Sequence, residues 1–172
     1  NRTVEIVDFD KNGKPDVFLG GFVKPFTYPV AQPSMVYFNK GNGVFESKKV
    51  AFEGLVTASI KLADNKILVV GEWMAPTILE WNSGELKINN QGISDNLEGW
   101  WNCVKSGDLD GDGDLDLVLG NIGRNVQFKA SPEEPAALVF SDFDQNGQID
   151  PFMDYYIQGS AYPPYSRDEV TD

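Results

Sequence analysis

A nine-residue acidic pattern occurs three times in the chain and constrains its fold more than any other feature. The three copies are DFDKNGKPD (8–16), DLDGDGDLD (108–116) and DFDQNGQID (142–150). Each copy has aspartate at positions 1, 3 and 9, asparagine or aspartate at position 5, and glycine at position 6. Carboxylates packed this closely repel one another, so the pattern predicts that each loop binds a cation.

The spacing of the polar residues favours calcium. In a tight loop, positions 1, 3, 5 and 9 can turn side-chain oxygens toward one point, and position 7 can add its main-chain carbonyl. Roughly 6–8 oxygen ligands in a flexible cage suit Ca²⁺ better than Mg²⁺. Glycine at position 6 tolerates the positive φ of a sharp turn. The predicted ligands are Asp8, Asp10, Asn12, Lys14 and Asp16 in the first loop, Asp108, Asp110, Asp112, Asp114 and Asp116 in the second, and Asp142, Asp144, Asn146, Gln148 and Asp150 in the third.

The loops differ from an EF-hand, whose twelve-residue loop closes with a glutamate at position 12. Position 12 is Leu19, Leu119 and Met153, none of which can bind a metal through its side chain. The flanking runs DVFLGG and DLVLGN are short, β-rich and end near glycine, so they indicate strands. The alternative is three acidic turns without metal. Position 2 is apolar in every copy, and we expect Phe9, Leu109 and Phe143 to point into a core.

Charge and composition exclude several classes of function. The 172 residues carry a net charge of −12, which argues against nucleic acid or an anionic membrane as a partner. Ten carboxylates are predicted ligands, so three bound Ca²⁺ ions would leave a charge of about −6. The chain has no histidine, the commonest general base and the usual imidazole ligand for zinc. No apolar run approaches the roughly 20 residues of a membrane-spanning helix.

Repetition suggests three blade-like units. We expect blades at about 3–46, 57–88 and 101–158, each built from four antiparallel strands. The middle unit has the short turn ADNK in place of the acidic loop, so it is predicted to bind no metal. Four-stranded units of this length are typical of β-propellers, which usually have 4–8 blades. The expected fold is therefore all-β, with about three blades of a larger propeller, the remaining blades lying outside this segment.

The third acidic loop begins only 34 residues after the second, too close for a full extra unit, so we expect the first of two placements. In the first, the loop lies at the tip of the second hairpin of the third blade, with Pro151 at the start of an edge strand. In the second, the loop opens a fourth unit. Cys103 is alone, so it forms no internal disulfide, and we expect it to be a small buried side chain rather than a reactive thiol.

With its acidic loops set in blade-like repeats, the chain resembles the FG-GAP/VCBS repeats of integrin-like β-propellers. The stretches GEWMAPT and GWWNCVKSGDLDGDGDLDLVLGNIGRNVQFKASPEEP are similar to large secreted VCBS-repeat proteins of bacteria, many of them from Bacteroidetes. The resemblance implies two to three structural Ca²⁺ ions and a secreted, periplasmic or outer-surface location. It also implies a binding or adhesion module, sometimes joined to an enzyme.

Three functions remain open from the sequence. The first is an extracellular calcium-stabilised scaffold that binds protein or glycan, which would not itself be an enzyme. The second is a glycan-active enzyme such as a polysaccharide lyase, with candidate residues Tyr155, Tyr156, Tyr162, Tyr165, Arg124 and Arg167. The third is a structural spacer. The four tryptophans fit either sugar stacking or packing between blades, and we expect packing. Trp100 and Trp101 are neighbours on an expected strand, so their side chains should face opposite ways.

Overall fold

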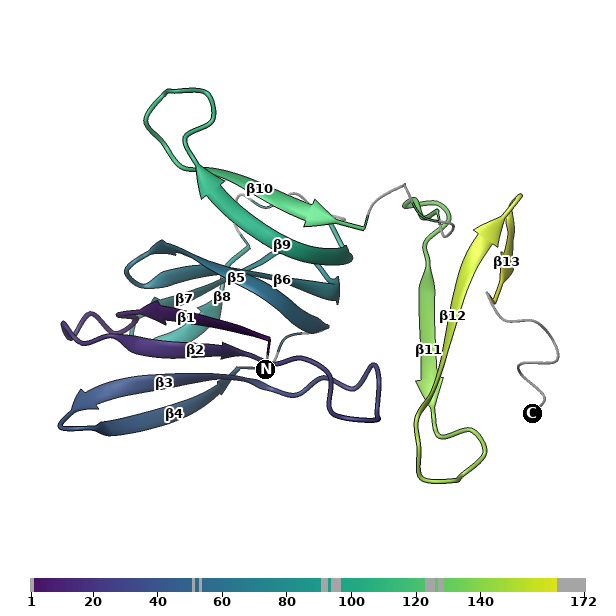
Figure 1. The fold of residues 1–172 in the computed structure, drawn as a ribbon, viewed down its shortest axis with the longest axis horizontal. Coiled ribbons are helices and arrows are strands. Elements are labelled where there is room, and N and C mark those ends of the chain that lie inside the picture. The colour runs from purple at the N-terminus through teal and green to yellow at the C-terminus, as the bar shows by residue number, and fades with distance from the viewer. Residues whose placement is uncertain are drawn as a thin grey trace. The chain divides into compact units, whose positions relative to one another are not determined.

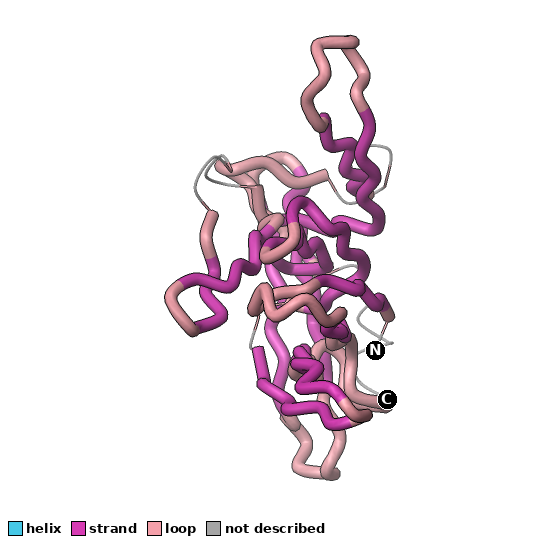
Figure 2. Tube along the Cα trace, turned by 90° about the vertical axis from the view of Figure 1, so that its left-hand side faces the viewer, coloured by secondary structure: helices cyan, strands magenta, loops and turns pink. Residues whose placement is uncertain are grey.

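The chain is all-β in the computed structural model, which describes residues 2–50, 52, 54–90, 93, 97–122, 126 and 129–163 (Figure 1). These residues form thirteen strands, all paired antiparallel, and no helix (Figure 2). The described part therefore has no helix that could cross a membrane. Contacts divide the chain into two compact units, Asn1–Val23 with Ala31–Asn121, and Lys24–Val30 with Ile122–Asp172.

The first sheet is a four-stranded meander in the order β1-β2-β3-β4. Its strands are β1 (Thr3–Val7), β2 (Asp16–Gly20), β3 (Ser34–Gly41) and β4 (Val44–Val50). Burial alternates residue by residue along β2 and most of β3, as expected for strands with one face on a core. The β3–β4 turn has Asn42 and Gly43 at positive φ, the arrangement that suits the twist of a tight hairpin.

The second sheet of the first unit contains another meander. The strands β5 (Leu55–Ala63), β6 (Lys66–Met74), β7 (Thr77–Asn82) and β8 (Glu85–Ile88) pair in chain order. The end of β6 also pairs with β9 (Gly99–Gly107), which pairs in turn with β10 (Asp116–Asn121). The first two units, predicted at about 3–46 and 57–88, correspond to four-stranded meanders that run from Thr3 to Val50 and from Leu55 to Ile88.

The main core lies between the two meanders. Buried side chains from β1–β4 and from β5–β7 form one cluster, which includes Phe18, Val36, Ile67 and Leu79. Trp81 packs against this cluster, with its ring 4.8 Å from that of Phe38. A smaller cluster gathers Leu68, Val70 and Val104, with Trp101 against it. The expectation that tryptophans pack is thus met for Trp81 and Trp101, whereas Trp73 and Trp100 pack edge-to-face on each other at 5.1 Å.

The expected third blade, 101–158, does not form one sheet. β9 and β10 belong to the first unit, whereas β11 (Ala137–Ser141), β12 (Asp150–Ile157) and β13 (Ser160–Tyr162) form a separate sheet in the second unit. The acidic loop 142–150 joins the first two strands of that sheet, as loop 8–16 does in the first. The expected placement in the third blade is therefore wrong, and the alternative, in which the loop opens a fourth unit, fits the observed pairing. Pro151 lies on the central strand β12, which has partners on both sides, and not on an edge strand.

Two predictions about burial are wrong. Phe9 is fully buried, but Leu109 is 68% exposed and Phe143 is 55% exposed. Phe9 packs edge-on against Phe38 of β3, whereas Phe143 has Phe152 of its own hairpin beside it. Cys103, expected to be buried, is exposed. Leu109 and Phe143 lack, among the described residues, a neighbouring hairpin like the one that supplies Phe38 beside Phe9. Cys103 precedes Val104, which faces the smaller cluster, so Cys103 lies on the other face of β9.

Candidate metal centre

Each acidic loop joins two paired strands at the same point of the register. The residue before position 1 pairs with the aspartate at position 9: Val7 with Asp16, Gly107 with Asp116, and Ser141 with Asp150. The aspartate at position 9 is thus the first residue of the second strand in all three hairpins. This pairing brings the two ends of each loop together.

The three loops also share a hydrogen-bond pattern. In the first loop, Asp16 accepts a 2.8 Å bond from the main-chain N–H of Phe9, and Asp8 accepts a 2.9 Å bond from that of Gly13. Asp10 accepts from the N–H of Asn12, and Asn12 accepts from that of Lys14. The other two loops repeat all four bonds at equivalent positions. The side chains at positions 1, 3, 5 and 9 are therefore all tied to the main chain of their own loop.

Two residues in each loop adopt the left-handed backbone conformation. Position 6 is the predicted glycine, with φ between 80° and 92° in Gly13, Gly113 and Gly147. Position 4 is also left-handed, with φ of 57° for Lys11, 80° for Gly111 and 59° for Gln145. The sequence pattern did not reveal position 4, because two of its three residues are not glycine. The glycine in the second loop is the one available signal.

The aspartates at positions 1, 3 and 9 converge in every loop. One carboxylate oxygen from each lies within 4.8 Å of the other two, for Asp8, Asp10 and Asp16 and for the equivalent groups 108, 110, 116 and 142, 144, 150. Three such oxygens fit on a sphere of about 2.8 Å radius or less, close to the 2.3–2.6 Å distance from Ca²⁺ to its oxygen ligands. The carboxylates present therefore fit a hard divalent cation.

Positions 5 and 7 supply the remaining predicted ligands. The position-5 side chains Asn12, Asp112 and Asn146 each accept the main-chain N–H of position 7. Asp112 is not within the group of three converging carboxylates of its loop. Asp114 and Gln148 are exposed, as are the position-5 residues Asp112 and Asn146, so the main-chain role of position 7 stays a prediction.

The β3–β4 hairpin braces the first loop. The N–H of Asn39 donates to Asp16 Oδ1 at 2.8 Å, and Asn12 Nδ2 donates to the Asn39 carbonyl at 3.1 Å. Lys40 Nζ lies 3.2 Å from Asp10 Oδ2 and 3.6 Å from Glu46 Oε2. The hydrogen bond to Asp10 raises the pKa of the Lys40 ammonium. Burial raises the pKa of the Asp16 carboxyl, against the hydrogen bonds from Asn39 and Phe9 that lower it.

The middle unit has a plain turn where the others have loops. Ala63 pairs with Lys66, so Asp64 and Asn65 alone connect β5 to β6. Asp64 Oδ1 accepts a 2.7 Å hydrogen bond from Lys61, which lowers the pKa of this carboxyl. The predicted hairpin turn with one acid is confirmed.

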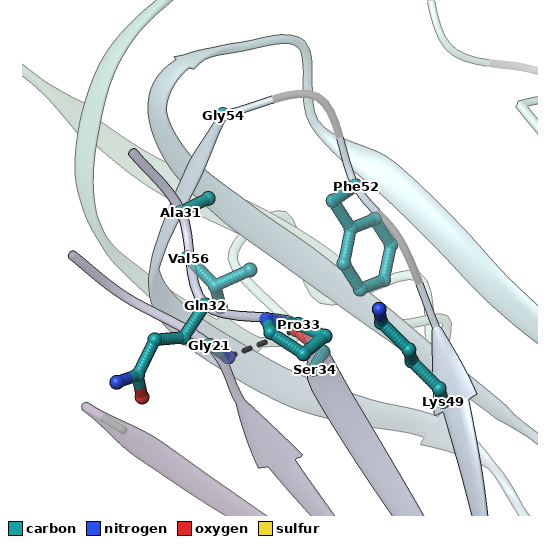
Figure 3. A pocket seen from close by; sticks show the side chains of 9 residues that line it. All are labelled: Gly21, Ala31, Gln32, Pro33, Ser34, Lys49, Phe52, Gly54 and Val56. Atoms are coloured by element: carbon teal, nitrogen blue, oxygen red, sulfur yellow. Dashed lines mark hydrogen bonds between the residues drawn. The ribbon is translucent and has the colours of Figure 1, made fainter. Parts of the chain in front are cut away.

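The residues considered for glycan chemistry do not form a site in the described part. Tyr155 is buried and pairs with Tyr162 across β12–β13. Arg124, Tyr165 and Arg167 lie outside the described residues. A cavity of about 160 Å³ in the first unit has Lys49 as the one charged side chain among its lining residues (Figure 3). No acid–base pair faces it.

Comparisons of the chain with protein-family models, with curated proteins and with solved structures found no match. The geometry of the three loops is therefore the main evidence for function.

Proposed function

We propose that the chain is a calcium-binding β-module, with Ca²⁺ bound in the loops 8–16, 108–116 and 142–150. One observation carries the proposal: three separate loops repeat the same convergence of three carboxylates and the same four hydrogen bonds. A solvated acidic turn has no need to repeat such an arrangement. All-oxygen coordination favours Ca²⁺, and the hairpin ends that the metal would clamp give it a structural role.

The module is proposed to be part of a larger β-propeller. The two four-stranded meanders β1–β4 and β5–β8 have the strand order of propeller blades. Exposed apolar side chains before and on β10 and on β11 support further covering segments, because the surface of a monomeric protein rarely leaves so many apolar side chains uncovered. These side chains are Leu115 in the loop before β10, Leu117 and Val118 on β10, and Val139 and Phe140 on β11.

As a function for the whole module, we propose an extracellular scaffold that binds protein or glycan, in a secreted, periplasmic or outer-surface setting. Calcium sites of modest affinity suit extracellular calcium, which is far more abundant than cytosolic calcium. The absence of histidine and of a described acid–base pair favours binding over catalysis. A glycan-active enzyme and a structural spacer remain as the alternatives.

The test of metal binding is calorimetric titration of the metal-stripped chain with Ca²⁺. We expect about two to three sites per chain, with Mg²⁺ much weaker. The single variants Asp8→Ala, Asp108→Ala and Asp142→Ala should each remove one site. A Thr→Ala change away from the loops, such as Thr27→Ala, is the control. A wild-type chain that takes up no Ca²⁺ would end the proposal.

The broader role is tested separately. A glycan array and a pull-down from cell surfaces, both with calcium-loaded protein, should detect a ligand if the module is a binding scaffold. Incubation with acidic polysaccharides, followed by absorbance of unsaturated products, should show no cleavage. Cleavage would favour the lyase, and an absence of both ligand and cleavage would favour the spacer.

A further inference from the structure

The first acidic loop differs from the other two in its positive charges. Its nine residues include Lys11 and Lys14 beside three aspartates. The second loop has five aspartates and no lysine or arginine, and the third has three aspartates and no lysine or arginine. Apo repulsion between carboxylates should therefore be weakest in the first loop.

A third lysine reaches the first loop from another strand. The ammonium of Lys40, at the end of β3, lies 3.2 Å from Oδ2 of the predicted ligand Asp10. The same ammonium lies 3.6 Å from Glu46 and 5.2 Å from the centre of the Phe38 ring, which fixes its direction. Within the described ranges, no lysine or arginine forms an ion pair with a carboxylate of the second or third loop.

The main chain and side chain of the neighbouring Asn39 tie the hairpin to the loop at three further points. Its N–H binds Asp16, its carbonyl accepts from Asn12, and its side-chain amide donates to the carbonyl of Pro15 at 3.2 Å. The first loop is thus closed from outside by contacts that need no metal. The described residues around the second and third loops provide no such cap.

We propose that Lys40 is an internal counter-ion that keeps the first loop closed without calcium and competes with calcium for Asp10. The ammonium offsets the repulsion between Asp8, Asp10 and Asp16 while Asn39 holds the closed geometry. Bound calcium must displace or weaken this ion pair, so the lysine lowers calcium affinity at the same site. The competition with calcium rests on the proposed calcium binding, whereas the role of Lys40 as a counter-ion does not.

The experiment follows the amides of Asn12, Gly13 and Lys14 in the full 172-residue chain by NMR. Hydrogen exchange is measured in EDTA for the wild type, Lys40→Met, Lys40→Arg and Lys87→Met. Lys87, which pairs with Glu85 on the surface, is a matched control outside the three acidic loops. We expect Lys40→Met to speed exchange of these amides about two- to fivefold, the range for a partly exposed ion pair. In Lys40→Arg and Lys87→Met, hydrogen exchange of these amides should stay near the wild-type rate.

A calcium titration of the same amides tests the competition. Lys40→Met should lower the apparent Kd of the first loop about two- to fivefold, because no ammonium then occupies Asp10. Unchanged exchange in Lys40→Met, or an equal change in Lys87→Met, would overturn the counter-ion role. An unchanged or raised Kd would overturn the competition. If no loop responds to Ca²⁺ in any variant, the proposed calcium function fails, and the EDTA measurements still decide the role of Lys40.

Discussion

The main-chain N–H of Phe9 donates a 2.8 Å hydrogen bond to Oδ2 of Asp16, seven residues further along the chain. Leu109 and Asp116 form the same bond at 2.8 Å, and Phe143 and Asp150 form it at 3.0 Å. The bond spans the base of each loop and leaves carboxylate lone pairs facing the interior. It accounts for the strict aspartate at position 9, since the side chain both closes the hairpin and faces the candidate metal position.

Removal of calcium should lower the thermal stability of the chain. Without metal, converging carboxylates at about 4 Å repel one another by roughly 4 kcal/mol per pair at an effective dielectric near 20, before relaxation. At a hundredfold excess over Kd, each bound Ca²⁺ adds about 2.7 kcal/mol of apparent stability. Thermal melts with and without chelator, at fixed ionic strength, should show a lower midpoint in EDTA that Ca²⁺ restores. An identical midpoint would identify the loops as acidic turns.

In the second loop, Asp112→Ala should weaken calcium binding more than Asp114→Ala. Both changes remove one negative charge, so general electrostatics cancel in the comparison. Asp112 accepts the N–H of Asp114 and is predicted to bind through its side chain, whereas Asp114 is predicted to bind through its main-chain carbonyl. Calorimetric titration of the two variants measures the contrast. Equal losses would show that the ligand register is wrong.

The loss of stability on replacing the position-2 side chain should differ strongly between the loops. Phe9 is fully buried and packs on Phe38, so Phe9→Ala should cost about 3–5 kcal/mol of unfolding free energy. Leu109 is mostly exposed, and Leu109→Ala should stay within about 0.5 kcal/mol in this chain. Urea unfolding in saturating Ca²⁺ provides both values. A large loss in Leu109→Ala would indicate a covering surface for β9–β10 in solution.

Acidification should release calcium. The first loop should begin to lose its calcium at a pH above the range in which ordinary aspartates take up protons. Protons compete with metal for carboxylates. Burial places the pKa of Asp16 above its ordinary value of about 3.9, so this competition starts at a higher pH than an unperturbed aspartate predicts. In the metal-free protein, the raised pKa of Asp16 has the opposite effect on the pH dependence of stability, because it makes the free energy of unfolding fall as the pH rises. A carboxyl with a raised folded-state pKa favours folding below its unfolded pKa, and this contribution is lost as pH rises through the folded pKa.

Titrations of the first-loop amides with Ca²⁺ between pH 7 and pH 4 measure this dependence. Asp16→Ala should remove most of the calcium binding by the first loop. The loss of calcium that begins above the usual pH range of aspartate should then disappear as well. A first-loop affinity that stays constant until the ordinary aspartate range would contradict the effect of burial on Asp16.

Local chemistry explains what could be predicted from the sequence. The period-two pattern of DVFLG indicates a strand, and Gly13, Gly113 and Gly147 mark sharp turns, because both signals depend on near neighbours. The left-handed Lys11 and Gln145 have no such signal. The cap formed by Asn39 and Lys40 lies more than twenty residues from the first loop, and it depends on the register of β2 with β3.

Strand pairing beyond a single hairpin was harder to predict from the sequence than the hairpins themselves. The 34-residue spacing of the last two acidic loops favoured one long unit over two. The structure distinguishes the two arrangements, because β12 pairs with β13 as well as with β11. This pairing depends on residues outside the acidic loop. The burial of Phe9 and the exposure of Phe143 likewise depend on neighbouring strands, although the two sequences around them are nearly identical.

The Asp64–Asn65 turn shows how a fold of this kind could gain or lose ions during evolution. Where β1 and β2 are joined by residues 8–15, β5 and β6 are joined by two residues, yet both hairpins belong to complete four-stranded meanders. The sheet therefore tolerates either connection. A short insertion or deletion at one hairpin tip would change the number of candidate metal loops per chain and leave the strands beneath it in register.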